Sequence, residues 1–255
     1  MKSTNLFQFP FTDRSVERKI LFDFIKSKHD TNILWLNGDH GIGKTFFLDN
    51  VLSEITDYNI INISVDPEIE APDYLRELVL SLQQASGIKF NKFIETNFKS
   101  ILNITKNIAV QLLKIKNIEL DELMEAIFDT TQLFVDNDDV KQSSEKAIGK
   151  YISHIISKKK VVLVLDNFIY CEKKSLQIIG SILLSFCTNS KIKFIIVTSE
   201  DNNANSKKVL EYISENIPCI PLPMYALDDS MYFHQIISSI FEIEDHTTDE
   251  FVKYI

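Results

Sequence analysis

At residues 38–45 the chain reads Gly38-Asp39-His40-Gly41-Ile42-Gly43-Lys44-Thr45. This octet matches the Walker A pattern G-x-x-x-x-G-K-[ST] at every constrained position. Glycines permit positive φ angles and a close backbone approach, so successive N–H groups of such a loop can point at one anion. In this pattern Lys44 reaches the β- and γ-phosphates of a nucleotide, and the Thr45 hydroxyl binds Mg²⁺. The octet therefore predicts a loop that binds a nucleotide together with Mg²⁺.

The segments on either side of the octet favour the same interpretation. Residues 33–37 form an apolar run typical of a buried strand, and residues 46–52 carry the apolar face of a helix. A phosphate-binding loop requires a strand, a loop and a helix in this order. The helix contributes because its N–H groups and its dipole favour negative charge at its N-terminus. Three of the 6 glycines in the chain lie in this octet.

The composition limits the class of protein. A length of 255 residues and a hydrophobic fraction of 45% fit one large domain, or one domain with a small appendage. The net charge of −9 argues against a surface that binds nucleic acid throughout. The 3 cysteines lack metal-ligand spacing, and neither a signal peptide nor an apolar run of ~20 residues occurs. We therefore expect a cytoplasmic protein with reduced thiols and no membrane contact.

Strand and helix patterns alternate along the chain, which predicts an α/β fold with a parallel, five-stranded sheet flanked by helices. The expected strands are residues 33–37, 58–65, 160–165, 191–199 and 217–220. The expected helices after the octet helix are residues 72–85, 173–187 and 205–216. An N-terminal arm and helix would occupy residues 1–28, and the core residues 29–221. Residues 222–255 would begin a helical subdomain that we expect to continue past Ile255.

Two segments allow more than one interpretation. In residues 6–28, Thr12 or Asp13 could cap a helix that either covers the core or forms a lid over the adenine of a nucleotide. Residues 88–157 contain no strand pattern and no proline, which predicts three or four inserted helices. Within them, residues 88–116 carry six lysines against one acid. A solvated helical face explains this excess, and so does a contact surface for nucleic acid or an acidic partner.

Polar residues follow two of the expected buried strands. Asp166 and Asn167 come after residues 160–165, which is the Walker B arrangement, where a strand delivers a carboxylate to the water shell of Mg²⁺. Thr198 lies near the end of the next strand. Because ligands bind beyond the carboxyl ends of parallel strands, we expect these residues to meet the octet. The candidate catalytic residues are Lys44, Asp166 and Asn167, and the candidate Mg²⁺ ligands are Thr45 and Asp166.

The order of these motifs resembles the STAND branch of the AAA+-related P-loop ATPases, which includes the NACHT and NB-ARC switch proteins. Residues 11–17 are similar to the family's apolar-x-Gly-Arg-x-x-Glu segment, with Asp13 in place of the glycine. Residues 163–167 resemble its Walker B strand, residues 195–200 its sensor strand, and residues 222–255 the start of its helical subdomain. The resemblance implies a set of nucleotide-binding residues, namely Phe11, Arg14, Gly38, Asp39, His40, Gly41, Ile42, Gly43, Lys44, Thr45, Phe46, Thr198 and Pro223.

Two departures from the family pattern bear on hydrolysis. Asn167 stands where the family usually has a second acid that polarises the attacking water. An amide can orient water but cannot accept its proton. Glu200 stands where the sensor arginine would contact the γ-phosphate, and a carboxylate there would repel that group. Both departures indicate tight binding with slow hydrolysis, which suits a switch.

The sequence thus favours a Mg²⁺-dependent molecular switch that binds ATP or ADP and hydrolyses ATP slowly. Nucleotide would close the lid and the helical subdomain over the core and control self-association of a signalling or defence protein, whose ligand or protein partner is sensed by a region outside this chain. The alternative is an AAA+-like ATPase that acts on nucleic acid through residues 88–116. A small-molecule kinase is disfavoured by the presence of only three arginines, and a GTPase by the lack of an Asn-Lys-x-Asp motif.

Overall fold

The computed structural model describes residues 14–65, 74–90, 92–94, 96, 138–200 and 204–226, with the backbone alone at 138–144 and 174. Several expectations lie outside these residues. They are the arm with Phe11, the cap candidates Thr12 and Asp13, most of the lysine-rich segment, and the helix expected after Pro223.

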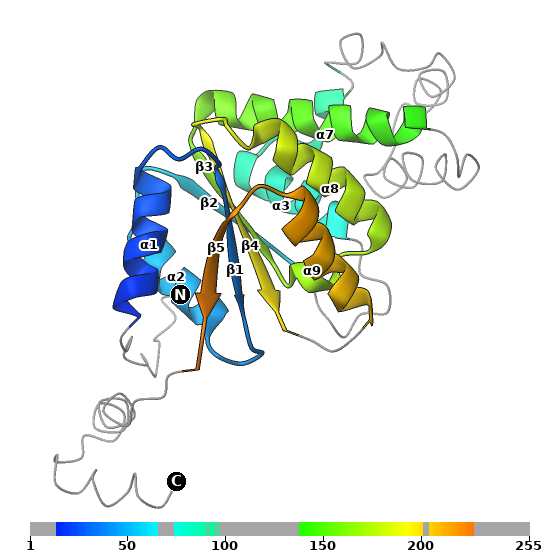
Figure 1. Ribbon diagram of the computed structural model, residues 1–255. Coiled ribbons are helices and arrows are strands. Elements are labelled where there is room, and N and C mark those ends of the chain that lie inside the picture. Colours follow the sequence, from blue (N-terminus) through cyan, green and yellow to red (C-terminus); the bar gives the residue numbers. More distant parts are fainter. Residues whose placement is uncertain are drawn as a thin grey trace, which may run out of the picture.

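Five strands form one all-parallel sheet, as the sequence predicts. In chain order they are β1 (Ile33–Gly38), β2 (Asn59–Ser64), β3 (Val161–Asp166), β4 (Ile192–Ser199) and β5 (Ile220–Met224). Their order across the sheet is β2-β3-β4-β1-β5 (Figure 1). Parallel pairing brings the carboxyl ends of all five strands to one edge of the sheet, which we call the carboxyl edge. The opposite edge is the amino edge.

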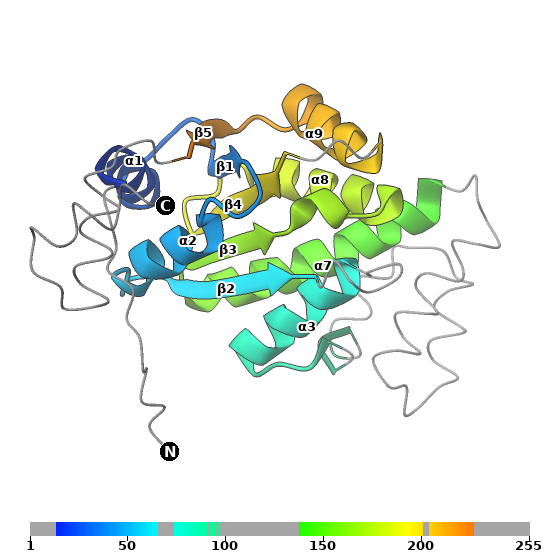
Figure 2. The ribbon, with the colours of Figure 1, turned by 90° about the horizontal axis from the view of Figure 1, so that it is seen from below.

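Helices cover both faces of the sheet (Figure 2). On one face lie α1 (Ser15–Lys26) and α2 (Lys44–Ser53). On the other lie α3 (Tyr74–Ser86), α7 (Asp138–Lys158), α8 (Lys173–Phe186) and α9 (Ala204–Asn216). A 3₁₀ turn, Phe168–Tyr170, follows β3. Among the described helices none is long and apolar enough to cross a membrane.

Strand β1 shows why the central strands read as continuous apolar runs. Its residues alternate between the two faces, so Leu34 and Leu36 pack under α1 and α2, and Ile33 packs in the core of the opposite face. Both faces are covered, and therefore both sets of side chains must be apolar. Residues 192–198 of strand β4 are likewise all buried, and they are apolar except for Lys193 and Thr198.

The last strand differs from the sequence prediction in its position. It was expected at residues 217–220 and lies at Ile220–Met224, so Leu222 and Pro223 belong to the sheet instead of the segment that follows it. Pro221 and Pro223 lack the N–H group that a ladder needs, and such residues are tolerated on edge strands. Strand β5 is an edge strand paired with β1 alone, which explains how two alternate prolines fit there.

The other boundaries agree with the sequence within about two residues. The first helix begins at Ser15, and its N-cap position is Arg14, whereas the sequence predicted Thr12 or Asp13. Arg14 makes no side-chain capping hydrogen bond and is used in another way, described below.

Candidate functional site

The loop of residues 38–45, hereafter the 38–45 loop, joins β1 to α2 at the carboxyl edge. Gly41 and Gly43 have φ angles of 82° and 87°, the left-handed region that glycine adopts without strain. Gly43 is the N-cap residue of α2, and an added Cβ at either glycine would point into open space. At Gly38 the reason for glycine is different, because a Cβ there would collide with the main-chain carbonyl of Met224 in β5. The loop is therefore open on one side and packed against β5 on the other.

Lys44 turns back over the loop from which it comes. Its side chain is buried, and its Nζ donates hydrogen bonds to the carbonyl oxygens of Gly38 at 2.9 Å and Asp39 at 2.6 Å. Burial lowers the pKa of Lys44, while the nearby carboxylates of Asp166, Asp39 and Glu200 act in the opposite direction. The loop thus holds one ammonium group among carboxylates, at the place where a polyphosphate would need a cation.

Thr45 and Asp166 meet across the carboxyl edge, although 121 residues separate them in the sequence. The Thr45 hydroxyl donates a hydrogen bond of 3.1 Å to Asp166 Oδ2. Asp166 is the last residue of β3, and its other carboxylate oxygen accepts the N–H of Asn167 at 2.8 Å. A hydroxyl beside a carboxylate is a donor set that suits Mg²⁺, which uses few protein oxygens and keeps waters or phosphate oxygens as its other ligands. In the described part of the chain, no group of three His, Cys, Asp or Glu side chains could hold a metal ion.

Asp166 is held by a residue that no sequence motif indicates. Tyr74, at the start of α3, is fully buried and donates a hydrogen bond of 2.7 Å to the main-chain carbonyl of Asp166. Its ring lies edge-on to Phe168 at a centroid distance of 5.2 Å. Burial raises the pKa of Tyr74 well above its usual value, so the hydroxyl remains a donor. Tyr74 thus fixes the end of β3 from the α3 side of the sheet.

Asn167 faces β2. Its φ angle of 54° is left-handed, a conformation that asparagine tolerates better than most residues. Its Nδ2 lies 3.3 Å from Ser64 Oγ and 3.2 Å from the Val65 carbonyl oxygen. The side chain therefore connects the ends of β2 and β3, and it can present an amide oxygen but no base to the site.

Thr198 is placed differently from the direct nucleotide contact that the sequence predicts. Its side chain is buried, it accepts the indole N–H of Trp35 at 2.8 Å, and it donates to Asn37 Oδ1 at 2.8 Å. Its single hydroxyl proton is thus used within the sheet. The Asn37 Nδ2 lies 3.5 Å from Glu200 Oε1, so these four residues form a chain that ends at the carboxyl edge. Trp35 and Asn37 were not predicted from the sequence. A signal was present for Asn37, which is a polar residue near the end of a buried strand.

Arg14 joins three parts of the molecule at the side of the 38–45 loop. Its guanidinium is buried and lies 2.8 Å from the carbonyl oxygen of Tyr225, just after β5, and 3.4 Å from that of Ile42. Glu17 pairs with it from the next turn of α1 at 3.2 Å. Arg14 thus links α1, the 38–45 loop and the residues after β5.

The remaining candidate residues lie on or near the surface of the loop. Asp39, His40 and Phe46 are exposed, and Ile42 packs partly against the core under α1 and α2. Pro223 is exposed on β5, where it pairs in register with Asn37.

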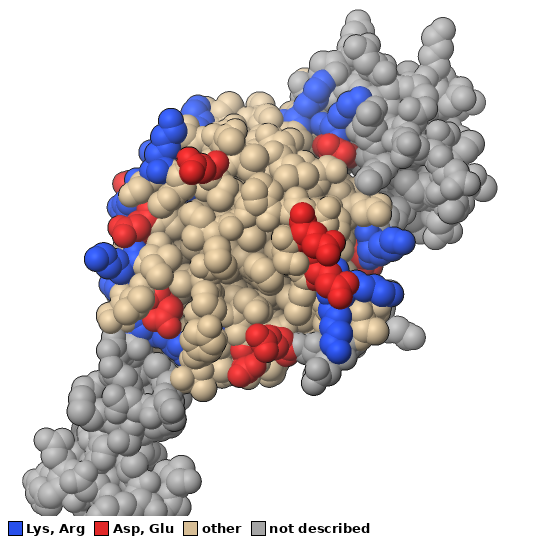
Figure 3. All heavy atoms as spheres, in the orientation of Figure 1, with Lys and Arg blue, Asp and Glu red and all other residues tan. Residues whose placement is uncertain are grey.

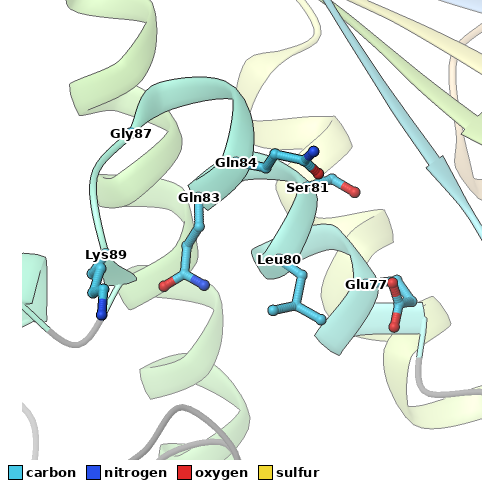
Figure 4. A pocket seen from close by; sticks show the side chains of 7 residues that line it. All are labelled: Glu77, Leu80, Ser81, Gln83, Gln84, Gly87 and Lys89. Atoms are coloured by element: carbon cyan, nitrogen blue, oxygen red, sulfur yellow. The ribbon is translucent and has the colours of Figure 1, made fainter. Parts of the chain in front are cut away.

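A separate hollow of about 680 Å³ lies on the outside of α3. The side chains around it are mostly polar, and they come from α3 and the turn that follows it (Figure 4). Gln83 is already used there, because its Oε1 accepts the N–H of Phe90. The lining residues include none from the 38–45 loop or the strand ends, so this hollow is not part of the candidate site.

The fold and the site together define an α/β protein with a five-stranded parallel sheet, whose polar groups converge at the carboxyl edge. The family model Nephrocystin 3, N-terminal matches residues 15–200, from the first residue of α1 to the residue after β4. This match covers more than half of the chain, which therefore belongs to the Nephrocystin 3, N-terminal family. No curated protein matches the sequence.

Proposed function

We propose that this chain is a nucleotide-dependent molecular switch of the STAND class of P-loop ATPases, which binds ATP with Mg²⁺ and hydrolyses it slowly. The observation that carries the proposal is the contact of 3.1 Å between Thr45 Oγ1 and Asp166 Oδ2. A Walker A threonine and a Walker B aspartate must adjoin to share one Mg²⁺, and a chance octet would give no reason for this meeting.

The described residues fit the separate parts of such a site. The left-handed glycines Gly41 and Gly43 leave the loop open for an anion, and the N-terminus of α2 begins directly after them. Lys44 would exchange its bonds to loop carbonyls for bonds to phosphate oxygens. When Mg²⁺ is bound, it neutralises charge on the β- and γ-phosphates, and Thr45 and Asp166 would hold it.

Slow hydrolysis follows from the residue after Asp166. A general base typically contributes 10²–10⁴-fold to a rate, and Asn167 has none to offer. Its amide nitrogen points to Ser64 and Val65, which leaves an amide oxygen that can orient water. Nucleotide would therefore remain bound for long periods, as a switch requires.

Arg14 supports the idea that the nucleotide controls a conformational change. Through its bonds to the Ile42 and Tyr225 carbonyls, it joins the phosphate loop to the residues that follow β5. A bound polyphosphate that moves the loop would shift the position of this guanidinium, and hence that of Tyr225 after β5. We propose that nucleotide state is transmitted in this way to a change in self-association.

The alternative function on nucleic acid has less support. In the face drawn in Figure 3, Lys and Arg side chains alternate with Asp and Glu around the rim and form no continuous basic stripe. A phosphate-binding surface needs such a stripe. Most of the lysine-rich segment lies outside the described residues, so this alternative rests on the sequence alone.

Size-exclusion chromatography with light scattering tests the proposed switch. The chain, extended to its full natural length if it continues past Ile255, is run with Mg²⁺ and either ATP, ADP or no nucleotide. We expect a different mass with ATP than with ADP, and no such difference for Lys44→Ala. An identical mass in all three conditions would exclude nucleotide-controlled self-association, and failure to bind either nucleotide would exclude the P-loop function itself.

A further inference from the structure

A chain of hydrogen bonds runs from the buried part of the sheet to Glu200. Trp35 donates to Thr198, Thr198 donates to Asn37, and the Asn37 amide lies 3.5 Å from Glu200 Oε1. Trp35 and Asn37 belong to β1 and Thr198 to β4, which are neighbours in the sheet (Figure 2). The polar atoms in this series of hydrogen bonds orient one another. The orientation of the Glu200 carboxylate is therefore influenced by Asn37 in the sheet and not by solvent alone.

The main chain also fixes Glu200 beside the 38–45 loop. Ser199 pairs in register with Gly38, and the N–H of Glu200 donates to the Gly38 carbonyl oxygen at 3.3 Å. The same carbonyl accepts a hydrogen bond from Lys44 Nζ. The backbone of Glu200 therefore contacts Gly38, the first residue of the loop. Glu200 and Lys44 both donate to the same carbonyl oxygen of Gly38.

The charges around Lys44 do not balance. Carboxylates of Asp39, Asp166 and Glu200 all act on its ammonium group. Arg14, the described arginine at the loop, is turned to the Tyr225 and Ile42 carbonyls instead. Even with Mg²⁺ beside Asp166, a nucleotide with one more phosphate brings further negative charge to a region that already holds an excess of it.

We propose that Glu200 sets the nucleotide preference of this site by lowering its affinity for ATP relative to ADP. This differs from the expectation drawn from the sequence, in which Glu200 accompanies tight binding of the nucleotide. The inference rests on the proposed nucleotide-binding function. The Lys44 ammonium would reach the β- and γ-phosphates, and ADP lacks the latter. Because Glu200 stands at the strand end beside Lys44, its carboxylate repels the terminal phosphate more than the inner ones. Mg²⁺ screens this repulsion in part.

The test compares ATP and ADP affinities by isothermal titration calorimetry, at constant Mg²⁺ and ionic strength. The variants are Glu200→Gln, which keeps an acceptor for Asn37 but removes the charge, and Glu200→Asp, which keeps the charge. Glu215→Gln in the last turn of α9 is the matched control, because it makes the same charge change away from the carboxyl edge. Glu200 is exposed, so we expect all of these variants to fold, and circular dichroism checks this.

For Glu200→Gln we expect ATP affinity to rise by roughly fivefold to tenfold and ADP affinity by less than about twofold, the size of a like-charge contact in a partly solvated site. Glu200→Asp and Glu215→Gln should keep the wild-type ratio, and higher salt should reduce the difference. An unchanged ATP-to-ADP ratio in Glu200→Gln, or an equal rise for both nucleotides, would overturn this inference and leave the proposed function intact. A wild-type chain that binds neither nucleotide would overturn both.

Discussion

Two buried lysines, one at the amino edge and one at the carboxyl edge of the sheet, have different surroundings. Lys193, near the start of β4, is 3% exposed and lies at the amino edge. Its Nζ donates to Asn32 Oδ1 at 2.9 Å and to the Ser27 carbonyl at 3.1 Å, and it lies 4.9 Å from the centre of the Phe24 ring. Burial lowers its pKa, and among the residues that the structure describes no carboxylate acts in the opposite direction.

Lys44, at the carboxyl edge, is 7% exposed and also donates to two carbonyl oxygens. It differs in two respects. Its neighbours include the carboxylates of Asp39, Asp166 and Glu200, and the glycines beside it face open space. Lys193 is closed in by the groups that satisfy it, whereas Lys44 lies where an incoming anion has room. Burial of a lysine alone therefore does not distinguish a structural role from a binding role, and the proposed binding role of Lys44 rests on the space and charge around it.

The largest effect on ATP affinity should come from removing the Lys44 side chain. We expect Lys44→Ala to weaken ATP binding by about 2–5 kcal/mol, the usual range for truncating one partner of a buried charge pair. Its stability should change little, because the Gly38 carbonyl keeps the hydrogen bond from the Glu200 N–H and Asp39 is an exposed residue. Calorimetric titration with ATP measures the first quantity and urea denaturation the second. Unchanged ATP binding would remove the distinction between the two lysines.

Removing the Lys193 side chain should have the opposite effects, because it should lower stability and leave ATP affinity nearly unchanged. We expect Lys193→Met to lower the free energy of unfolding by about 2–3 kcal/mol, because Asn32 Oδ1 and the Ser27 carbonyl would lose a buried donor. The affinity for ATP should remain within about twofold of wild type. The midpoint of urea unfolding and the titration used for Lys44→Ala report the two effects. A loss of ATP affinity without a loss of stability would show that the amino edge also binds the ligand.

Arg14 is another buried cation at the carboxyl edge, and it links α1, the 38–45 loop and Tyr225 after β5. We expect Arg14→Ala to cost about 1–3 kcal/mol of stability, since the Tyr225 carbonyl loses its donor. Arg18→Ala is the control, because Arg18 pairs with Glu54 at the surface and should contribute about 0–1 kcal/mol. In Arg14→Ala, ATP should still bind, but the mass change between ATP and ADP should disappear. If that mass change survives, the segment after β5 is not controlled through Arg14.

Asn167 should give the smallest effect. Asn167→Asp supplies the missing carboxylate but loses the amide donors to Ser64 and the Val65 carbonyl, so its orientation is less defined. We expect ATP hydrolysis to speed up by about tenfold, below the usual contribution of a well-placed base. Asn167→Glu places the carboxylate one methylene further from the backbone. The release of phosphate over time measures the rate of ATP hydrolysis in both variants. Equal rates for wild type and both variants would mean that residue 167 does not contact the attacking water.

Much of the sheet could be predicted from the sequence because each central strand is buried on both faces. The stretches at residues 33–36, 161–165 and 194–197 are continuous and apolar for that reason, and the three strands end close to where they were expected. Strand β5 was misplaced at residues 217–220, because Pro221 and Pro223 are tolerated in a strand only at the edge of a sheet, and the sequence does not show that β5 lies there. The position of β5 emerges only when its single neighbour is known.

The candidate site was predictable only where a motif fixes the residue. Lys44 and Thr45 follow from the octet, and Asp166 follows from its strand. The contacts of Thr198 and Arg14 could not be predicted, because they depend on partners far apart in the sequence, such as Trp35 for Thr198. The left-handed backbone of Asn167 and the hydroxyl of Tyr74 beneath Asp166 are likewise products of the tertiary fold.

The most direct test of the account is the Mg²⁺ dependence of ATP binding in a double-mutant cycle of Thr45→Val and Asp166→Asn. If these residues share one Mg²⁺, Mg²⁺ should tighten ATP binding to wild type, each single variant should lose most of that gain, and the double variant should lose little more. Single variants that keep the full Mg²⁺ effect, or two losses that simply add, would contradict a metal site shared between the loop and the end of β3.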